Sequence, residues 1–185
     1  MKFTPLAIPD VISIEPELYE DDRGFFMETY NRDVFAEHGI EVEFVQLNHS
    51  RSVRNTLRGL HYQVGKPQAK LVRVIRGEVY DVVVDIRFGS PTYGKWLSET
   101  LSDANKKQIY VPIGFAHGFC VVSKEAEFIY ACTDTYYPEG ERGILWNDPD
   151  LAIIWPAIDP LLSEKDEHNK AFSSIMHDFI YKKGI

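Results

Sequence analysis

The segment Leu57–Gln63 reads LRGLHYQ and places two ionisable side chains in a run typical of a β-strand. Alternate residues of a strand share a face, so His61 lies with Gly59 and Gln63, while Arg58 lies on the opposite face. Charged side chains are rarely buried without a partner. We therefore expect this strand to face either water or a polar cavity inside the fold. In the second case the cavity is a candidate active site.

Acid–base chemistry next to a carbonyl group is the reaction that these residue types suggest. His61 can act as a base, and Lys70, nine residues on, can stabilise the enolate oxygen that forms. Tyr130 is either a packing residue of its strand or a proton donor on the face opposite His61, which would invert a carbon centre. Asp166 is either an acid at the start of a helix or the carboxylate that fixes the tautomer of His61.

Two arginines and an aromatic residue suggest a nucleotide ligand. Arg23 and Arg58 together suit a diphosphate, because the planar guanidinium group binds phosphate oxygens in pairs. Tyr136 could stack on a base, although an exposed aromatic is also common. The pair His61 and His117 raises the possibility of a metal, but no third ligand is evident and a nearby lysine would repel a cation. We therefore predict no metal.

Length and composition limit the class of protein. The chain has 185 residues, which fits a single domain over 1–185, with 44% hydrophobic and 13% aromatic residues. No apolar run reaches membrane-spanning length and no signal peptide is evident, so we expect a cytoplasmic protein without a membrane partner. The net charge of −8 argues against nucleic-acid binding but allows a small anionic ligand. Cys120 and Cys132 are expected to be buried free thiols.

Turn signals recur at short intervals between runs of β-branched and aromatic residues, which predicts an all-β sandwich or barrel. The expected strands, besides the one that carries His61, are Val42–Leu47, Leu71–Ile75, Val79–Ile86, Trp96–Leu101, Gln108–Val111, Gly118–Val122 and Glu127–Thr133. A short helix is expected over Arg32–His38, capped by Asn31, and another from Ser163. The tail Lys170–Tyr181 has roughly helical spacing and is expected to be less firmly ordered.

The order of several long motifs resembles the dTDP-4-dehydrorhamnose 3,5-epimerase family, whose members are cupin-like jelly-roll barrels. The resemblance covers about residues 5 to 168. The matching segments are Ile8–Val11, Asp22–Phe26, Phe44–Ser50, Leu57–Gln63, Lys70–Arg73, Gly77–Asp81, Pro112–Phe119 and Ile144–Asp148. The fold implied is a jelly roll with a few short helices, mainly near the C-terminus.

The resemblance also implies a role for each candidate residue. His61 matches the catalytic base, Asp166 its carboxylate, Tyr130 the proton donor, and Lys70 the residue that stabilises the enolate. The implied substrate contacts are the diphosphate ligands Arg23 and Arg58, the base-stacking Tyr136, and Glu28, Gln46, Asn48, His117, Glu141 and Lys165. Members form homodimers without a metal or organic cofactor. Departures from the family pattern occur at Leu47, at Ala69 and over 171–185.

These observations predict an isomerase that epimerises C3 and C5 of dTDP-4-keto-6-deoxy-D-glucose in dTDP-L-rhamnose biosynthesis. Four alternatives remain open. They are a mono-epimerase acting at C3 or C5 only, a 3,4-ketoisomerase, a non-catalytic sugar-binding cupin and a metal-dependent cupin oxygenase. The apolar segment Phe3–Val11 would suit strand exchange in the implied homodimer.

Overall fold

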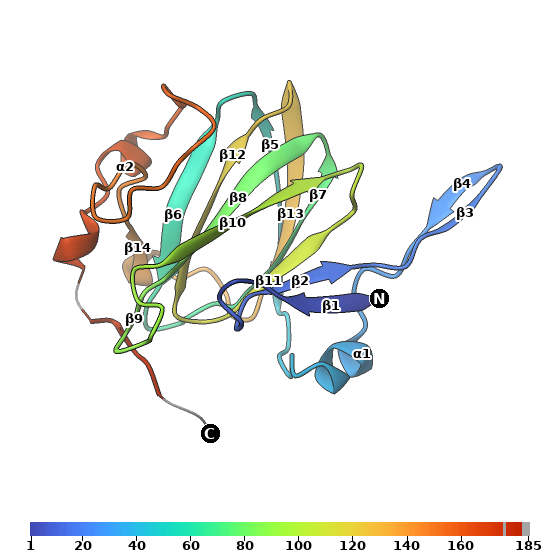
Figure 1. The fold of residues 1–185 in the computed structure, drawn as a ribbon, viewed down its shortest axis with the longest axis horizontal. Helices are drawn as coiled ribbons and strands as arrows, with labels where there is room; N and C mark the ends of the chain where they lie inside the picture. The colour runs from blue at the N-terminus through green and yellow to red at the C-terminus, as the bar shows by residue number, and fades with distance from the viewer. Residues whose placement is uncertain (176, 183–185) are drawn as a thin grey trace.

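Two antiparallel β-sheets face each other in the computed structural model, which describes residues 1–175 and 177–182 (Figure 1). The six-stranded sheet has the order β1 (Lys2–Pro5), β2 (Ile12–Glu15), β11 (Gln108–Val111), β7 (Lys70–Arg76), β13 (Glu125–Cys132) and β5 (Gln46–Val53). The five-stranded sheet has the order β10 (Trp96–Ser102), β8 (Glu78–Asp85), β12 (Phe115–Val121), β6 (Leu57–Gln63) and β14 (Glu141–Gly143).

Successive strands alternate between the two sheets, from β5 to β8 and again from β10 to β14. This winding brings residues that are far apart in the chain onto the two inner faces. The prediction of an all-β jelly roll is thereby confirmed. The two sheets keep separate hydrogen-bond networks and face each other, rather than closing into one continuous barrel.

Strand β8 shows why its sequence, EVYDVVVD, carries no simple alternation of apolar and polar residues. Val79 and Val83 belong to the core between the sheets, where Phe128 of β13 also lies. Val82 and Val84 point the other way and pack beneath the C-terminal part of the chain. Because both faces of the strand are buried, both require apolar side chains.

Two short helices lie outside the sheets. Helix α1 (Arg32–Glu37) is capped by Asn31, whose Oδ1 accepts from the amides of Asp33 (3.1 Å) and Val34, as predicted. Helix α2 (Glu164–Glu167) begins after Ser163, again as predicted. Turns of 3₁₀ helix are found at Pro138–Gly140 and Phe172–Ser174.

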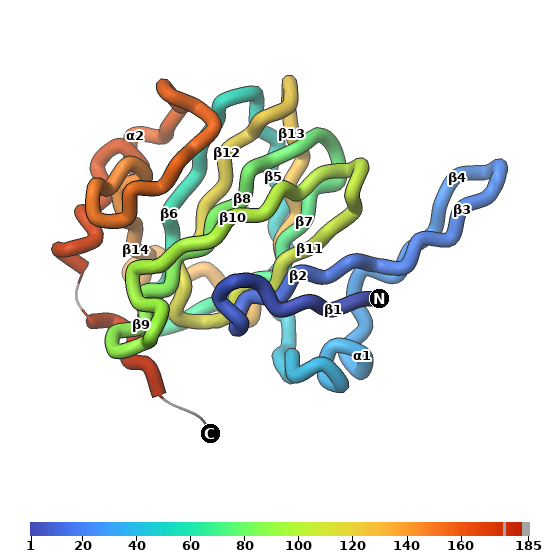
Figure 2. The backbone as a smooth tube through the Cα atoms, in the orientation of Figure 1, coloured from blue at the N-terminus to red at the C-terminus, as the bar shows by residue number. Residues whose placement is uncertain are grey.

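A hairpin of β3 (Tyr19–Asp21) and β4 (Gly24–Phe26) projects away from both sheets (Figures 1 and 2). We call residues 19–26 the arm. Its aromatic side chains Tyr19, Phe25 and Phe26 are exposed. The segment Phe3–Val11 does not project: β1 pairs with β2 of the same chain and forms one edge of the six-stranded sheet.

The helical spacing predicted for the tail is wrong over the residues described. After the turn at Phe172–Ser174, strand β15 (Phe179–Ile180) pairs in parallel with β9 (Arg87–Phe88). Phe172, in the turn, and Phe179, in β15, both pack against the outer face of the five-stranded sheet. The strand predicted over 42–47 is displaced, because β5 begins only at Gln46 and continues to Val53.

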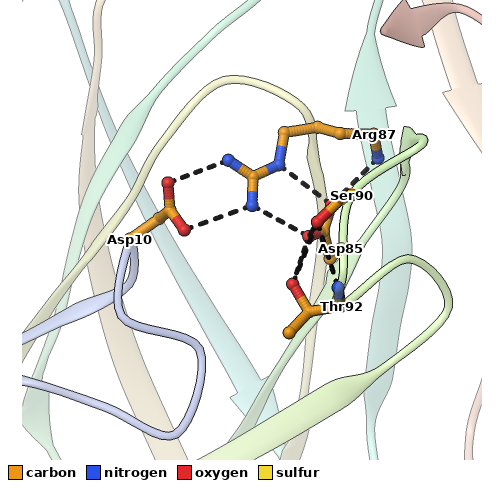
Figure 3. A network of polar contacts seen from close by, with 5 residues as sticks. All are labelled: Asp10, Asp85, Arg87, Ser90 and Thr92. Carbon is orange, nitrogen blue, oxygen red and sulfur yellow. Dashed lines mark hydrogen bonds and ion pairs between the residues drawn. The ribbon is translucent and has the colours of Figure 1, made fainter. Parts of the chain in front are cut away.

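A polar network joins the β1–β2 turn to the end of β8 and the residues that follow it (Figure 3). Arg87 lies between Asp10 of the β1–β2 turn, at 2.9 Å, and the fully buried Asp85, at 2.8 Å. Burial alone would raise the pKa of Asp85, but hydrogen bonds from Arg87, Ser90 and Thr92 lower it. The carboxylate therefore stays charged inside the protein, where it anchors the bend after β8.

The two cysteines, Cys120 and Cys132, are buried and free, as predicted. Among the helices that the structure describes, none has the length and apolar character needed to cross a membrane.

Candidate active site

A cavity of about 260 Å³ opens between the sheets, and helix α2 lines one side of it. The five-stranded sheet contributes residues of β6, β12 and β14, and the six-stranded sheet contributes residues of β5, β7 and β13. A smaller hollow adjoins this cavity and shares four lining residues with it. Together the two hollows collect most of the predicted site residues, namely His61, Lys70, Tyr130, Asp166, Gln46, Asn48, Arg58, His117, Tyr136, Glu141 and Lys165.

His61 and Asp166 form a pair across the cavity wall. Nε2 of His61 lies 2.5 Å from Oδ1 of Asp166, which is only 3% exposed. Burial alone would raise the pKa of Asp166, but hydrogen bonds from His61 and Ser163 lower it. An ionised carboxylate requires a proton on the nitrogen that faces it, so Nε2 carries a proton, and in the neutral imidazole the lone pair is on Nδ1. His61 is therefore oriented to act as a base through Nδ1.

Arg58 lines the same cavity as His61, which contradicts the opposite faces expected from strict alternation. Arg58 pairs with Phe119 of β12, and His61 pairs with His117, so β6 has one more residue than β12 over this stretch. Such a bulge reverses the alternation. Gly59, with a φ of +125°, lies so close to Gly118 that a Cβ at either position would overlap backbone atoms.

Lys70 and Tyr130 reach the cavity from the opposite, six-stranded sheet. Burial lowers the pKa of Lys70, although Cys132, Asp81 and Glu141 favour the charged form. Burial raises the pKa of Tyr130, so its hydroxyl remains protonated over the neutral range. The cavity thus holds a base on one sheet, and a cation with a proton donor on the other.

A second histidine–carboxylate pair lies beside the first. His117 faces His61 across the β6–β12 register, and its Nε2 is 2.9 Å from both oxygens of Asp81. Sequence reasoning missed Asp81. The sequence feature that could have revealed it is a charged residue within the apolar strand β8, on the same face as the inward-facing Val79 and Val83. A buried charge of this kind requires a partner, and here His117 provides it.

The smaller hollow continues the cavity toward the surface and is rich in amide side chains. Oε1 of Gln46 accepts from the amide of Tyr136 at 2.8 Å, and Nε2 of Gln46 donates to Asn48 at 3.1 Å. Tyr136 is 55% exposed, and its hydroxyl donates to Glu141 at 2.6 Å. Glu141 also forms an ion pair with Lys165 of α2. An aromatic face surrounded by amides is suited to a nucleobase.

Arg23 and Glu28 are the two predicted ligands that the structure does not bring to the cavity. Arg23 belongs to the turn of the arm, where its side chain is 89% exposed and forms an ion pair with Asp21. Glu28 follows the arm and accepts a hydrogen bond from Asn31. Neither residue lines either hollow.

No cluster of three or more His, Cys, Asp or Glu side chains suitable for a metal occurs in the described part of the chain. Each cavity histidine is instead paired with a single aspartate.

Comparison with known proteins identifies the family. Residues 5–174 match the family model described as dTDP-4-dehydrorhamnose 3,5-epimerase. The dTDP-4-dehydrorhamnose 3,5-epimerase of Pseudomonas aeruginosa is 60% identical over 175 residues, which cover 94% of this chain and 97% of that protein. The dTDP-4-dehydrorhamnose 3-epimerase of Streptomyces niveus is 46% identical over 169 residues, which cover 90% and 82%.

A solved structure is similarly close. The dTDP-6-deoxy-D-glucose-3,5-epimerase of Legionella pneumophila, in complex with dTDP-4-keto-L-rhamnose, superposes with a TM-score of 0.95 at 47% identity and 98% coverage of each chain. Fold and cavity therefore define a jelly-roll epimerase, an isomerase that works by acid–base chemistry. Within that class, the chain belongs to the dTDP-4-dehydrorhamnose 3,5-epimerase family.

Proposed function

We propose that this protein inverts both C3 and C5 of dTDP-4-keto-6-deoxy-D-glucose and releases dTDP-4-keto-L-rhamnose. The observation that carries the proposal is the placement of His61 and Tyr130 on opposite sheets, with Lys70 in the same cavity. A base on one side of a sugar ring and an acid on the other side can invert a carbon centre.

The reaction follows from the groups that line the cavity. Nδ1 of His61 removes the proton from C5, and the electron pair of that C–H bond moves to form the enolate at the C4 oxygen. The ammonium group of Lys70 stabilises this oxygen. Tyr130 then delivers a proton to C5 from the other side, and the enolate returns to the ketone. The same ketone acidifies the C3 proton, so the same residues serve the second inversion.

The nucleotide occupies the outer part of the site in this proposal. Arg58 binds the diphosphate, and its Nε already donates to Ser52 at 3.1 Å, which holds the guanidinium toward the cavity. Tyr136 stacks on the thymine, while Gln46 and Asn48 supply hydrogen bonds. His117, Glu141 and Lys165 complete the ligand contacts. A doubly charged nucleotide sugar does not cross membranes unaided, which supports action in the cytoplasm, where a reductase would complete dTDP-L-rhamnose.

Proton NMR in D₂O tests the proposal. With dTDP-4-keto-6-deoxy-D-glucose, deuterium is expected at both C3 and C5, and an NADPH-dependent reductase should convert the product to dTDP-L-rhamnose. The 46% identical 3-epimerase of Streptomyces niveus makes mono-epimerisation the second candidate, and label at one carbon only would establish it. If neither C3 nor C5 exchanges its proton, the protein does not epimerise this substrate.

We further propose that the active unit is a homodimer in which the arm of one copy completes the site of the other. Arg23 and Glu28 lie outside their own cavity, and three aromatic side chains of the arm are exposed. The outer face of the six-stranded sheet has an apolar hollow that includes Leu47. Val45, just before β5, and Val53, at the other end of that strand, are also exposed. A second copy would cover these surfaces.

Mixing two inactive variants tests this arrangement. We expect the Arg23→Ala and His61→Asn proteins each to have little activity. The two variants are mixed in equal amounts, unfolded together and refolded, so that about half of the dimers are heterodimers. Each heterodimer should have one complete site of its two, which gives about a quarter of the number of sites in the wild type. Light scattering checks that both variants dimerise. A mixture no more active than the sum of its parts would show that Arg23 does not act across the interface.

A further inference from the structure

The amide of Asn169 lies against the carboxylate that orients the proposed base. Its Nδ2 donates to Oδ1 of Asp166 at 3.4 Å, and this is the oxygen that also accepts from His61. On the other side of the carboxylate, the hydroxyl of Ser163 donates to Oδ2 at 2.9 Å. Both oxygens of Asp166 thus accept a hydrogen bond from a residue other than His61, with Ser163 in the cavity wall and Asn169 outside the cavity.

The backbone around Asn169 fixes the position of its side chain. Lys170 forms an isolated parallel bridge with Ile144, and its carbonyl accepts from the amide of Leu145 at 2.9 Å. This bridge attaches the chain after α2 directly to the end of β14.

Gly143 provides the space that the amide of Asn169 occupies. A Cβ at Gly143 would overlap the amide group of Asn169, so no larger residue fits there without displacing it. Gly143 is in register with His61 on the neighbouring strand β6. The amide therefore lies beside the backbone of the strand that carries the base.

We propose that Asn169, whose amide occupies the space beside Gly143, is a positioning residue that holds Asp166 in line with His61 and stabilises its carboxylate. This inference rests on the proposed function, because it assigns a base role to His61. A neutral donor at this position stabilises the carboxylate without adding charge. It leaves the imidazole free to alternate between its neutral and protonated forms during turnover. Asn169 touches neither of the two hollows.

The variant Asn169→Asp tests the proposal with almost no change in shape. It replaces the donor with a second carboxylate, and two negative charges favour the protonated imidazole. We expect the acid limb of the kcat/KM profile to move up by about one pH unit. The KM at pH values above that limb should stay within about twofold of the wild type, since the nucleotide contacts are unaltered.

The control is Lys170→Gln, at the exposed residue next to Asn169. It lowers the net charge by one, as Asn169→Asp does. It should leave the profile in place. Histidine ¹⁵N NMR of the free protein provides a readout without substrate, in which the His61 titration should move upward in Asn169→Asp only. If Asn169→Asp titrates like the wild type, the inference is wrong. If the shift is seen but wild-type protein exchanges no substrate protons, the proposed function fails while the positioning role stands.

A double-mutant cycle separates positioning from a merely structural role. Asn169→Ala should lower kcat in the wild-type background and have no further effect on the residual rate of Asp166→Asn, because the amide acts through that carboxylate. Equal losses in both backgrounds would overturn the proposal.

Discussion

Replacing His61 with asparagine is expected to lower kcat by about 10²–10⁴-fold, the usual contribution of a positioned general base. The loss follows from the geometry of the pair, in which Nε2 faces Asp166 and Nδ1 is the nitrogen left to remove the proton. An asparagine amide can still donate to Asp166, so the buried carboxylate keeps a partner. The fold should therefore be preserved while the chemistry is lost.

The measurement is the rate of product formation in the reductase-coupled assay, together with deuterium incorporation at C3 and C5. Both should fall together, because one base serves both carbons. The matched control is His38→Asn, which changes an exposed histidine at the end of α1, where Nδ1 of His38 lies 2.8 Å from the carbonyl oxygen of Val34. Activity above a tenth of the wild-type rate in His61→Asn would contradict the assignment of the base.

Local patterns predicted the parts of this fold that depend on local physics. Alternating β-branched residues indicated β7, β10, β11 and β13, and the capping side chains Asn31 and Ser163 marked the starts of both helices. Asp166 follows from the second of these caps, because a helix that begins after Ser163 places it in the first turn.

Features that depend on contacts between distant segments were missed or misread. The bulge that turns Arg58 toward His61 arises from the close approach of Gly59 and Gly118, which are 59 positions apart in the chain and not detectable by counting along one strand. The pairing of Asp81 with His117 likewise depends on how β8 and β12 meet. The chemical type of Arg23 and the family resemblance both grouped it with Arg58, but neither indicated that Arg23 belongs to a projecting arm outside its own cavity.

Replacing Lys70 with methionine is expected to lower kcat by about 10²–10³-fold, with little change in KM. The ammonium group interacts most strongly with the C4 oxygen when negative charge develops there, so its removal affects the transition state more than substrate binding. Methionine fills similar space and is compatible with the partly buried position. The same assay measures the effect, with Lys66→Met as the control, since Lys66 lies in the preceding loop and contacts Thr135.

The alkaline side of the pH profile gives a second test of Lys70. Burial lowers the pKa of Lys70 from its ordinary value of 10.5, whereas burial raises the pKa of Tyr130. As the pH rises, the stabilising ammonium is therefore lost before the tyrosine proton, and kcat should decline at a lower pH than for an ordinary lysine. In Lys70→Arg the guanidinium stays charged, so the alkaline limb should move to higher pH. The overall rate should be lower than that of the wild type, because the guanidinium differs in shape from the ammonium group. An alkaline limb that stays in place in Lys70→Arg would show that another group controls it.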